Sequence, residues 1–252
     1  MDFDVAIAAP AVAAALMAGA VNAIAGGGTF VTFGVLVALG VPALEANATS
    51  TAALWLGFVG STWGYRRHLG PARALLPALG PVSVAGAALG AWLLVRLGDD
   101  AFQRAVPWLL ATATVLFAVA PRLQGLRDPA DRAPRVAPLI GAQVVIAVYG
   151  GYFGGGIGIL MLTAFALCGI GDLLAANGLK GLLAFAINAA AVAVFGAIGP
   201  VRWPLALTMA IAAALGGWLG AHVATRSTAV AVRWFVVATG ALLTVAFFCK
   251  GR

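Results

Sequence analysis

Hydrophobic residues run along this chain in stretches that are too long for the core of a soluble protein. Residues 5–44 and residues 136–171 contain no charged side chain. About 20 apolar residues are enough for a helix to cross the hydrocarbon core of a bilayer, so each run exceeds one crossing. Backbone groups in hydrocarbon need partners within the protein, which only helices or closed barrels supply. Because both runs are rich in Ala and Leu and do not alternate with polar residues, we expect an all-α, polytopic membrane protein.

Short polar stretches divide the chain into eight apolar segments, which we expect to form about eight transmembrane helices. The segments cover residues 5–40, 44–65, 74–95, 102–121, 137–171, 173–198, 203–224 and 231–249. One longer polar stretch, residues 122–136, contains two prolines and two acidic residues and is predicted to be a solvent-exposed linker. The chain therefore divides into a first transmembrane repeat at residues 1–121, this linker, and a second transmembrane repeat at residues 137–252.

The two sides of the linker resemble each other, which indicates an internal duplication. A shift of 130 positions places Asn47 on Asn177, and a shift of 128 places the glycine triplet 26–28 on the triplet 154–156. The first shift also aligns Gly86 with Gly216, Gly90 with Gly220, Ala91 with Ala221 and Arg96 with Arg226. Many transporters consist of such repeats and bind their substrate between them, so the duplication favours a transporter.

The composition supports the membrane assignment and argues against several other classes. Charged residues make up 9% of the chain, against about 25% in a typical soluble domain, and hydrophobic residues make up 63%. The net charge of +7 comes from arginines in short loops, which set membrane topology, so no nucleic-acid partner is expected. Cys168 and Cys249 lie in apolar segments without the spacing of metal ligands, and we expect no metal and no cofactor.

The distribution of Lys and Arg among the loops predicts the topology. If each long segment, 5–40 and 137–171, crosses the membrane once, ten loop cations lie on one side and four on the other. Such a bias places both termini and the linker in the cytoplasm, with eight spans and two four-span repeats that share one orientation. If the long segments instead cross twice, the counts are nine and five, a weaker bias.

Three consecutive glycines interrupt each long segment. They are Gly26, Gly27 and Gly28 in the first and Gly154, Gly155 and Gly156 in the second. Each glycine is about 1 kcal/mol less favourable than Ala in a helix, so a triplet predicts a break. We expect half-helices that begin near Thr29 and Gly158, with N–H groups and a positive dipole end that suit an anion. The alternative is that these glycines only allow helices to pack closely.

Lys180 is a cation deep in an apolar segment. If a helix begins after the capping residue Asp172, Lys180 lies about 12 Å along it, near the middle of a hydrocarbon core of about 30 Å. A cation there costs about 2.5–3.5 kcal/mol and therefore needs a partner. No acidic residue lies at a similar depth, so we expect a bound anion to be that partner. The alternatives are snorkelling to the membrane surface and hydrogen bonds to backbone carbonyls.

Polar side chains form a matching stripe on one predicted helix of each half. The stripes are Asn177, Lys180, Gly181 and Asn188 in the second half, and Asn47, Ser50, Thr51 and Ser61 in the first. Ser50 holds the position equivalent to Lys180, so we expect an asymmetric site. For each of these hydroxyls or amides alone, packing between helices is the alternative role.

The motif Val21-Asn22-Ala23-Ile24-Ala25-Gly26-Gly27-Gly28-Thr29, followed by Leu39-Gly40-Val41-Pro42 and Ala46-Asn47-Ala48-Thr49-Ser50, resembles the sulfite exporter TauE/SafE family. The second half agrees through Gly154-Gly155-Gly156-Ile157-Gly158 and Ala176-Asn177-Gly178-Leu179-Lys180. One departure is Thr32-Phe33-Gly34, where members often carry a proline. The resemblance implies an inner-membrane permease that exports sulfite, organosulfonates or related anions.

The candidate substrate-binding residues are Asn22, Gly26, Gly27, Gly28, Thr29, Asn47, Ser50, Thr51, Gly154, Gly155, Gly156, Gly158, Asn177, Lys180 and Asn188. No deep His, Asp or Glu is available for a nucleophile–base pair, so we expect no enzyme and no catalytic residue. A permease for another small anion and a non-transporting scaffold or receptor stay open as alternatives. The expected partners are a small anion and the lipid bilayer, and a homodimer also stays open.

Overall fold

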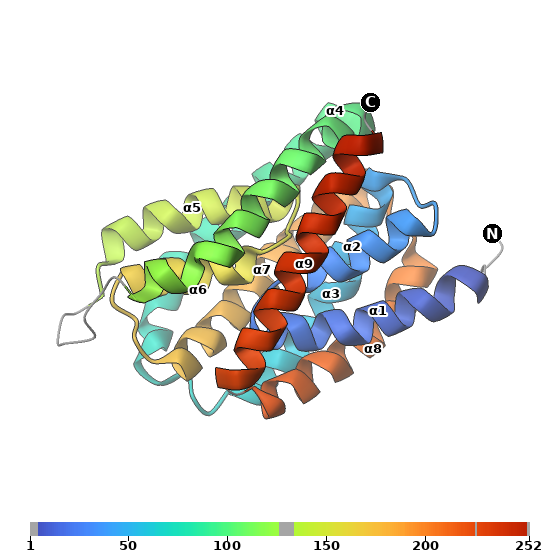
Figure 1. The fold of residues 1–252 in the computed structure, drawn as a ribbon. Helices are drawn as coiled ribbons and strands as arrows, with labels where there is room; N and C mark the ends of the chain where they lie inside the picture. Colours follow the sequence, from blue (N-terminus) through green and yellow to red (C-terminus); the bar gives the residue numbers. More distant parts are fainter. Residues whose placement is uncertain (1–4, 126–133, 225, 251–252) are drawn as a thin grey trace.

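The computed structural model describes residues 5–125, 134–224 and 226–250, and every regular element within these ranges is a helix (Figure 1). The α-helices in chain order are α1 (Val5–Ile24), α2 (Gly28–Ala38), α3 (Ala43–Tyr65), α4 (Leu76–Gly125), α5 (Val136–Tyr152), α6 (Ile157–Leu167), α7 (Leu173–Ile198), α8 (Trp203–Val223) and α9 (Arg226–Lys250), with a 3-10 helix η1 (Gly70–Leu75) before α4. The expected all-α architecture is confirmed. The middle of the predicted linker, residues 126–133, and the two chain ends lie outside the described residues.

Gly98 divides α4 into two arms, residues 76–97 and 99–125. Its φ of 77° and ψ of −178° are not helical, and glycine adopts them far more easily than a residue with a Cβ. The two arms correspond to the predicted segments 74–95 and 102–121. Five stretches of the described chain, one of which contains both arms of α4, are long and apolar enough to cross a membrane.

Both long segments fold into helical hairpins, α1–α2 and α5–α6. The start of α5 lies beside the end of α6, because the Arg135 backbone N–H donates a hydrogen bond of 2.8 Å to the Cys168 carbonyl. Gly28, the first residue of α2, packs back against α1, and a Cβ there would lie 2.1 Å from the Ala18 carbonyl oxygen. Figure 1 shows α2 ending at the same end of the molecule at which α1 begins. The expectation that each long segment crosses once is therefore wrong.

The glycine triplets produce these reversals. Gly26 has a φ of 81°, and Gly154 and Gly156 have φ values of 75° and 86°. Residues with a Cβ seldom adopt such left-handed conformations, so the turns depend on glycine. The half-helices then begin at Gly28 and Ile157, each within one residue of the predicted start.

Corresponding helices of the two halves run in opposite directions. Gly178 of α7 faces Tyr65 of α3, whereas Gly181, further along α7, faces Thr62. Residue numbers therefore rise along α7 as they fall along α3, so the two helices are antiparallel.

The second arm of α4 and α9 are antiparallel in the same way. Trp108, early in this arm, contacts Phe248 near the end of α9, with ring centroids 5.2 Å apart. Thr114, further along the arm, faces Gly240, which comes earlier in α9. The expectation that the two halves share one orientation is therefore wrong. Hydrophobic patterns carry no information about the direction of a helix, which is why the sequence did not distinguish the two arrangements.

Different helix termini lie at the two ends of the molecule. We call the end where α1 begins and α9 ends the terminal end, and the end where α4 ends and α5 begins the linker end. They lie on opposite sides of the helical bundle (Figure 1). The expectation that the linker and both termini share one side of the membrane is therefore wrong.

Small residues hold the two halves together. Gly90 of α4 faces α5, and a Cβ on it would lie 2.0 Å from the Val148 carbonyl oxygen. Gly216 of α8 faces α1 in the same way, and a Cβ there would lie 1.9 Å from the Leu16 carbonyl oxygen. Each half thus contributes one helix that packs against the first helix of the other half, as small-residue pairs in membrane proteins do. The core around α2 contains five fully buried aromatic rings: Phe30, Phe33, Phe102, Phe117 and Phe153.

Candidate functional site

The two hairpins meet at their turns in the middle of the molecule. We call residues 22–28 the first tip and residues 152–158 the second tip. A Cβ on Gly26 would lie 2.5 Å from the Gly158 Cα, and a Cβ on Gly158 would lie 2.5 Å from the Gly26 Cα. The two backbones are therefore in direct contact, and no side chain larger than a hydrogen atom fits between them. The structure has the non-helical backbone that the triplets predict, and it brings the two breaks together.

Lys180 holds the end of α1 at the first tip. Its ammonium donates to the backbone carbonyls of Asn22 at 3.0 Å and Ala23 at 3.3 Å, and to Asn177 Oδ1 at 2.7 Å. The side chain is 1% exposed, so these three contacts use all three ammonium hydrogens away from water. Backbone carbonyls were one of the alternatives to a bound anion. The last carbonyls of a helix carry its negative dipole end, and a cation stabilises that end.

Local sequence signals place Lys180 at this point. The Asp172 carboxylate accepts hydrogen bonds from the N–H groups of Leu174 and Ala175 and so starts α7 at Leu173. Tyr65 of α3 also donates to the Ala23 carbonyl, at 3.3 Å. Tyr65 was not among the predicted site residues, although a hydroxyl at the end of an apolar segment is a signal that could have marked it.

Asn22 caps the start of α2, on the other side of the first tip. Its Oδ1 accepts a hydrogen bond of 2.7 Å from the Gly28 N–H, at the start of α2. An N-terminal N–H of a half-helix, which we expected to bind an anion, is therefore occupied by an uncharged side chain of the same hairpin. The first tip is thus closed by protein groups at both of its helix ends.

The second tip is held by uncharged donors. Asn47 Nδ2 donates to the Tyr152 carbonyl at the end of α5, at 3.2 Å, and Tyr149 donates to the Gly155 carbonyl at 2.6 Å. The residue before α6, Gly156, is left-handed and provides no side-chain cap. The second tip therefore has no cation against the end of α5 and no capping side chain at the start of α6 in the described part of the chain. Tyr149 and Tyr152 were also missed by the sequence analysis.

Two buried oxygens one turn apart on α3 have no hydrogen-bond partner among the described residues. They are Asn47 Oδ1 and Ser50 Oγ, and both side chains are 0% exposed. Lys180, which corresponds to Ser50 in the duplicated pattern, has a complete set of partners. The predicted asymmetry between the two stripes is therefore present in the hydrogen bonding.

The remaining candidates form hydrogen bonds within their own helices or pack among apolar groups. Thr51 donates to the Asn47 carbonyl at 2.9 Å, and Asn188 donates to the Ala184 carbonyl at 2.8 Å, in both cases four residues earlier in the helix. Thr29 is buried in the first turn of α2, and Gly27 lies against the side chains of Val236 and Phe117. No hydrogen bond between described residues joins the side chain of Thr51 or Asn188 to either tip.

A bidentate ion pair joins the two halves at the terminal end. Arg202, just before α8, binds Glu45 in the first turn of α3 through Nε at 2.7 Å and Nη2 at 3.1 Å. The Arg202 N–H also donates to Thr49 at 3.1 Å. The hydrogen bond to Glu45 raises the pKa of Arg202, so the guanidinium stays charged.

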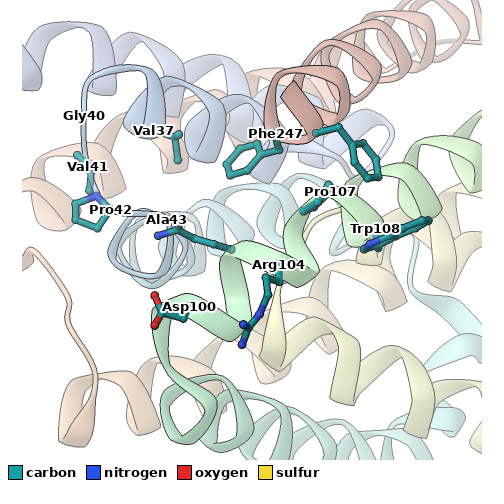
Figure 2. Close-up of a pocket in the computed structure, with 12 residues that line it drawn as sticks. Val37, Gly40, Val41, Pro42, Ala43, Asp100, Arg104, Pro107, Trp108 and Phe247 are labelled. Carbon is teal, nitrogen blue, oxygen red and sulfur yellow. The ribbon is translucent and has the colours of Figure 1, made fainter. Parts of the chain in front are cut away.

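A cavity of about 710 Å³ opens at the terminal end, between the α2–α3 loop, the second arm of α4 and the end of α9 (Figure 2). Its lining includes two charged residues, Asp100 and Arg104, and the aromatic rings of Trp108 and Phe247. None of the candidate site residues lines it. The two polar stripes predicted from the sequence therefore do not line this cavity.

Comparisons with known proteins agree with a transport function. The family model described as "Sulfite exporter TauE/SafE" matches residues 11–247. The chain is 32% identical over 219 residues to a probable membrane transporter protein, ORF9, of Sinorhizobium sp, and the match covers 84% of this chain and 80% of the relative. It is 27% identical to a probable membrane transporter protein of Haemophilus influenzae, with 97% and 95% covered. It is 25% identical to the probable membrane transporter protein YfcA of Escherichia coli K12, with 91% and 85% covered.

No solved structure matches the chain. The family match spans both hairpins, both tips and Lys180, and the relatives cover nearly the same length. The resemblance seen in the glycine motifs is therefore confirmed, and so is the multi-pass membrane character. This chain belongs to the sulfite exporter TauE/SafE family of membrane transporters.

Proposed function

We propose that the protein exports a small anion, sulfite or an organosulfonate, through a path that opens and closes around the two hairpin tips. The observation that carries this proposal is the contact between Gly26 and Gly158. Two hairpins that begin at opposite ends meet there, so a small movement of either one would expose the same central point to one side. Transporters with inverted repeats and broken helices place their substrate at such a point.

The start of α6 is the place where we expect the anion to bind. Its first N–H groups and positive dipole end face the centre of the molecule, and Gly156 offers no side-chain cap. The start of α2 is less suited, because Asn22 already accepts from the Gly28 N–H. The candidate glycines of the second tip therefore form the site with their backbone, while Gly26 closes it from the opposite hairpin.

Lys180 supports this site without being fully available to the substrate. Its ammonium keeps the end of α1 in place through the Asn22 and Ala23 carbonyls. That anchor fixes Gly26 against Gly158 and supplies positive charge to the same buried region. We therefore propose Lys180 as a positioning residue that favours an anion at the tips.

The inverted halves also suggest an orientation in the inner membrane. Each half then contributes one hairpin and three full spans. Among the described residues, seven cations belong to segments at the linker end: Arg66, Arg67, Arg73, Arg122, Arg135, Arg226 and Arg233. Four belong to segments at the terminal end: Arg96, Arg104, Arg202 and Lys250. We infer from this excess that the linker end faces the cytoplasm and that the terminal end, with the cavity of Figure 2, faces outward.

Binding of anions to the purified protein tests this proposal. Sulfite, taurine and isethionate are titrated against the protein in detergent, with chloride and the cation choline as references for ionic strength. We expect at least one sulfur oxyanion to raise the unfolding temperature in a saturable way, as a ligand of the folded state must. A response to carboxylates or phosphate alone would favour a permease for another anion. No response to any anion would favour a scaffold or receptor.

A further inference from the structure

We propose that a single monovalent cation, sodium by its ligands, binds at the end of α5 between Asn47 Oδ1, Ser50 Oγ and the Tyr152 backbone carbonyl. The site rests on the proposed function, because it supplies that transporter with a co-ion beside the anion. The cation is not the exported substrate.

The geometry of Asn47 fixes which of its atoms is available. Its Nδ2 donates to the Tyr152 carbonyl at 3.2 Å, which holds the amide against the end of α5. The other polar atom of the amide, Oδ1, is therefore the one that can bind a ligand. Ser50 follows one turn later on the same face of α3. Both side chains are 0% exposed, and neither oxygen has a hydrogen-bond partner in the described part of the structure. Five other buried polar atoms of the described chain are also unpaired, but these two oxygens lie one turn apart on the same face, which favours a shared ligand.

The other half of the molecule shows what such a position holds. At the end of α1, the ammonium of Lys180 binds the Asn22 carbonyl, the Ala23 carbonyl and Asn177 Oδ1. A shift of 130 positions turns Lys180 into Ser50 and Asn177 into Asn47, whereas the shift of 128 that relates the glycine triplets turns Asn22 and Ala23 into Gly150 and Gly151. The fold thus places a fixed positive charge against the end of α1, whereas against the end of α5 it places the uncharged Asn47, on the Tyr152 carbonyl, and Ser50 one turn later. A mobile cation of the same charge completes the pattern.

The ligand set favours sodium over other ions. An amide oxygen, a hydroxyl and a backbone carbonyl are hard, neutral donors, and the negative end of the α5 dipole adds to their attraction. Calcium and magnesium sites normally include carboxylates, which balance the second charge. Among the described residues, no group of three or more His, Cys, Asp and Glu could hold a metal ion. In transporters with broken helices, the C-terminal ends of half-helices commonly coordinate sodium.

The cation and the proposed anion would occupy neighbouring ends of one turn. In the second tip, four residues (153–156) separate the end of α5 at Tyr152 from the start of α6 at Ile157. Opposite charges at these two ends attract each other, so each ligand raises the affinity for the other by the same factor. The site therefore gives the transporter a means of coupling the anion to a sodium gradient.

Sodium binding is measured on the purified full-length protein without any substrate anion. The unfolding temperature is recorded against increasing sodium chloride, with choline chloride holding the ionic strength constant, and radioactive sodium binding is measured in parallel. We expect a saturable rise with sodium alone in the wild type. The Ser50→Ala variant should bind sodium about tenfold more weakly, which corresponds to about 1.4 kcal/mol. Ser50→Thr, which keeps the hydroxyl, should retain most of the affinity.

The most direct test is a variant that carries its own ammonium group at the proposed cation site. Ser50→Lys places at the end of α5 the group that Lys180 places at the end of α1, so this variant should no longer respond to sodium. Ser61→Ala is the matched control, because Ser61 is a buried hydroxyl on the same helix that already donates to the Phe58 carbonyl at 3.2 Å. It should bind sodium as the wild type does. If Ser50→Lys does not fold, the comparison of sodium binding by Ser50→Ala and by Ser61→Ala tests the site without it.

Equal responses to sodium and choline in the wild type, or unchanged sodium binding by Ser50→Ala, would overturn the site. Sulfite transport that persists without sodium would contradict the site and leave the export function intact. Sodium binding that depends on Ser50, in a protein that neither binds nor moves any anion, would support the site and overturn the export function.

Discussion

Gly26 and Gly158 come from hairpins that enter from opposite ends of the molecule, and each leaves room for no more than a hydrogen atom on the other. A Cβ on either residue would lie 2.5 Å from the Cα of its partner. Gly26 also has a φ of 81°, so its conformation and its surroundings both require glycine. The contact defines the point at which the two inverted halves meet, and it locates the proposed transport path.

Ala at this contact should therefore be costly. We expect Gly158→Ala and Gly26→Ala to destabilise the protein by about 1–3 kcal/mol, the range for overpacking of a close-packed interior. The unfolding temperature in detergent measures this. Gly141→Ala is the control, since a Cβ on Gly141 of α5 meets no atom within 4 Å. An unchanged unfolding temperature for Gly158→Ala would show that the tips are not in contact.

Lys180 should be needed for the stability of the first tip. Lys180→Met keeps a long apolar chain but leaves the Asn22 and Ala23 carbonyls and Asn177 Oδ1 without their shared donor. Buried groups without partners cost about 1–3 kcal/mol, and we expect a loss of stability in that range. Lys180→Arg, which keeps the charge, should lose less. A Met variant that is as stable as the wild type but has lost anion binding would favour direct contact with the substrate instead.

Asn22 should act as a helix cap. Asn22→Ala removes the acceptor for the Gly28 N–H, and loss of such a cap costs about 0.5–2 kcal/mol. Asn22→Asp keeps an acceptor and should retain the cap. Thermal unfolding of the two variants against the wild type tests this. If Ala and Asp behave alike, the 2.7 Å hydrogen bond does not hold α2.

The orientation can be tested with the native cysteines. Cys249 is exposed near the end of α9, at the proposed outer face, whereas Cys168 is buried. A membrane-impermeant maleimide should therefore label the wild type in intact cells, and Cys249→Ser should remove the labelling. Arg122→Cys in the Cys249→Ser background should react only after permeabilisation. Labelling of Arg122→Cys in intact cells would reverse the orientation.

The helices and the breaks could be predicted from the sequence because both depend on local composition. The uncharged runs located the long segments, the glycine triplets located the turns, and Asp172 located the start of α7. The direction of the chain after each triplet could not be predicted this way, because an apolar half-helix has the same composition whichever way it runs. A stretch of about 12 residues is too short to cross, so half-helices could be predicted while their direction could not.

The candidate site was predicted only in part, for a different reason. Asn22, Lys180 and the glycines do lie at the tips, since their residue types are unusual in apolar segments. The partners of Lys180 are mostly backbone carbonyls, which every residue carries and which the sequence cannot distinguish. Thr51 and Asn188 satisfy their own helices, a common role for polar residues in apolar helices that the stripe pattern could not separate from a binding role.

Export around the two tips is tested most directly by flux of radiolabelled sulfite in liposomes that contain the purified protein. Vesicles with the wild type should lose internal sulfite in a saturable way, and unlabelled sulfite or taurine should compete. Gly158→Ala, which disturbs the tip contact, should move sulfite much more slowly at equal protein content, whereas Gly141→Ala should match the wild type. Flux no faster than in protein-free vesicles, for every sulfur oxyanion tested, would contradict the export of these anions; equal flux by Gly158→Ala would contradict the role of the tips.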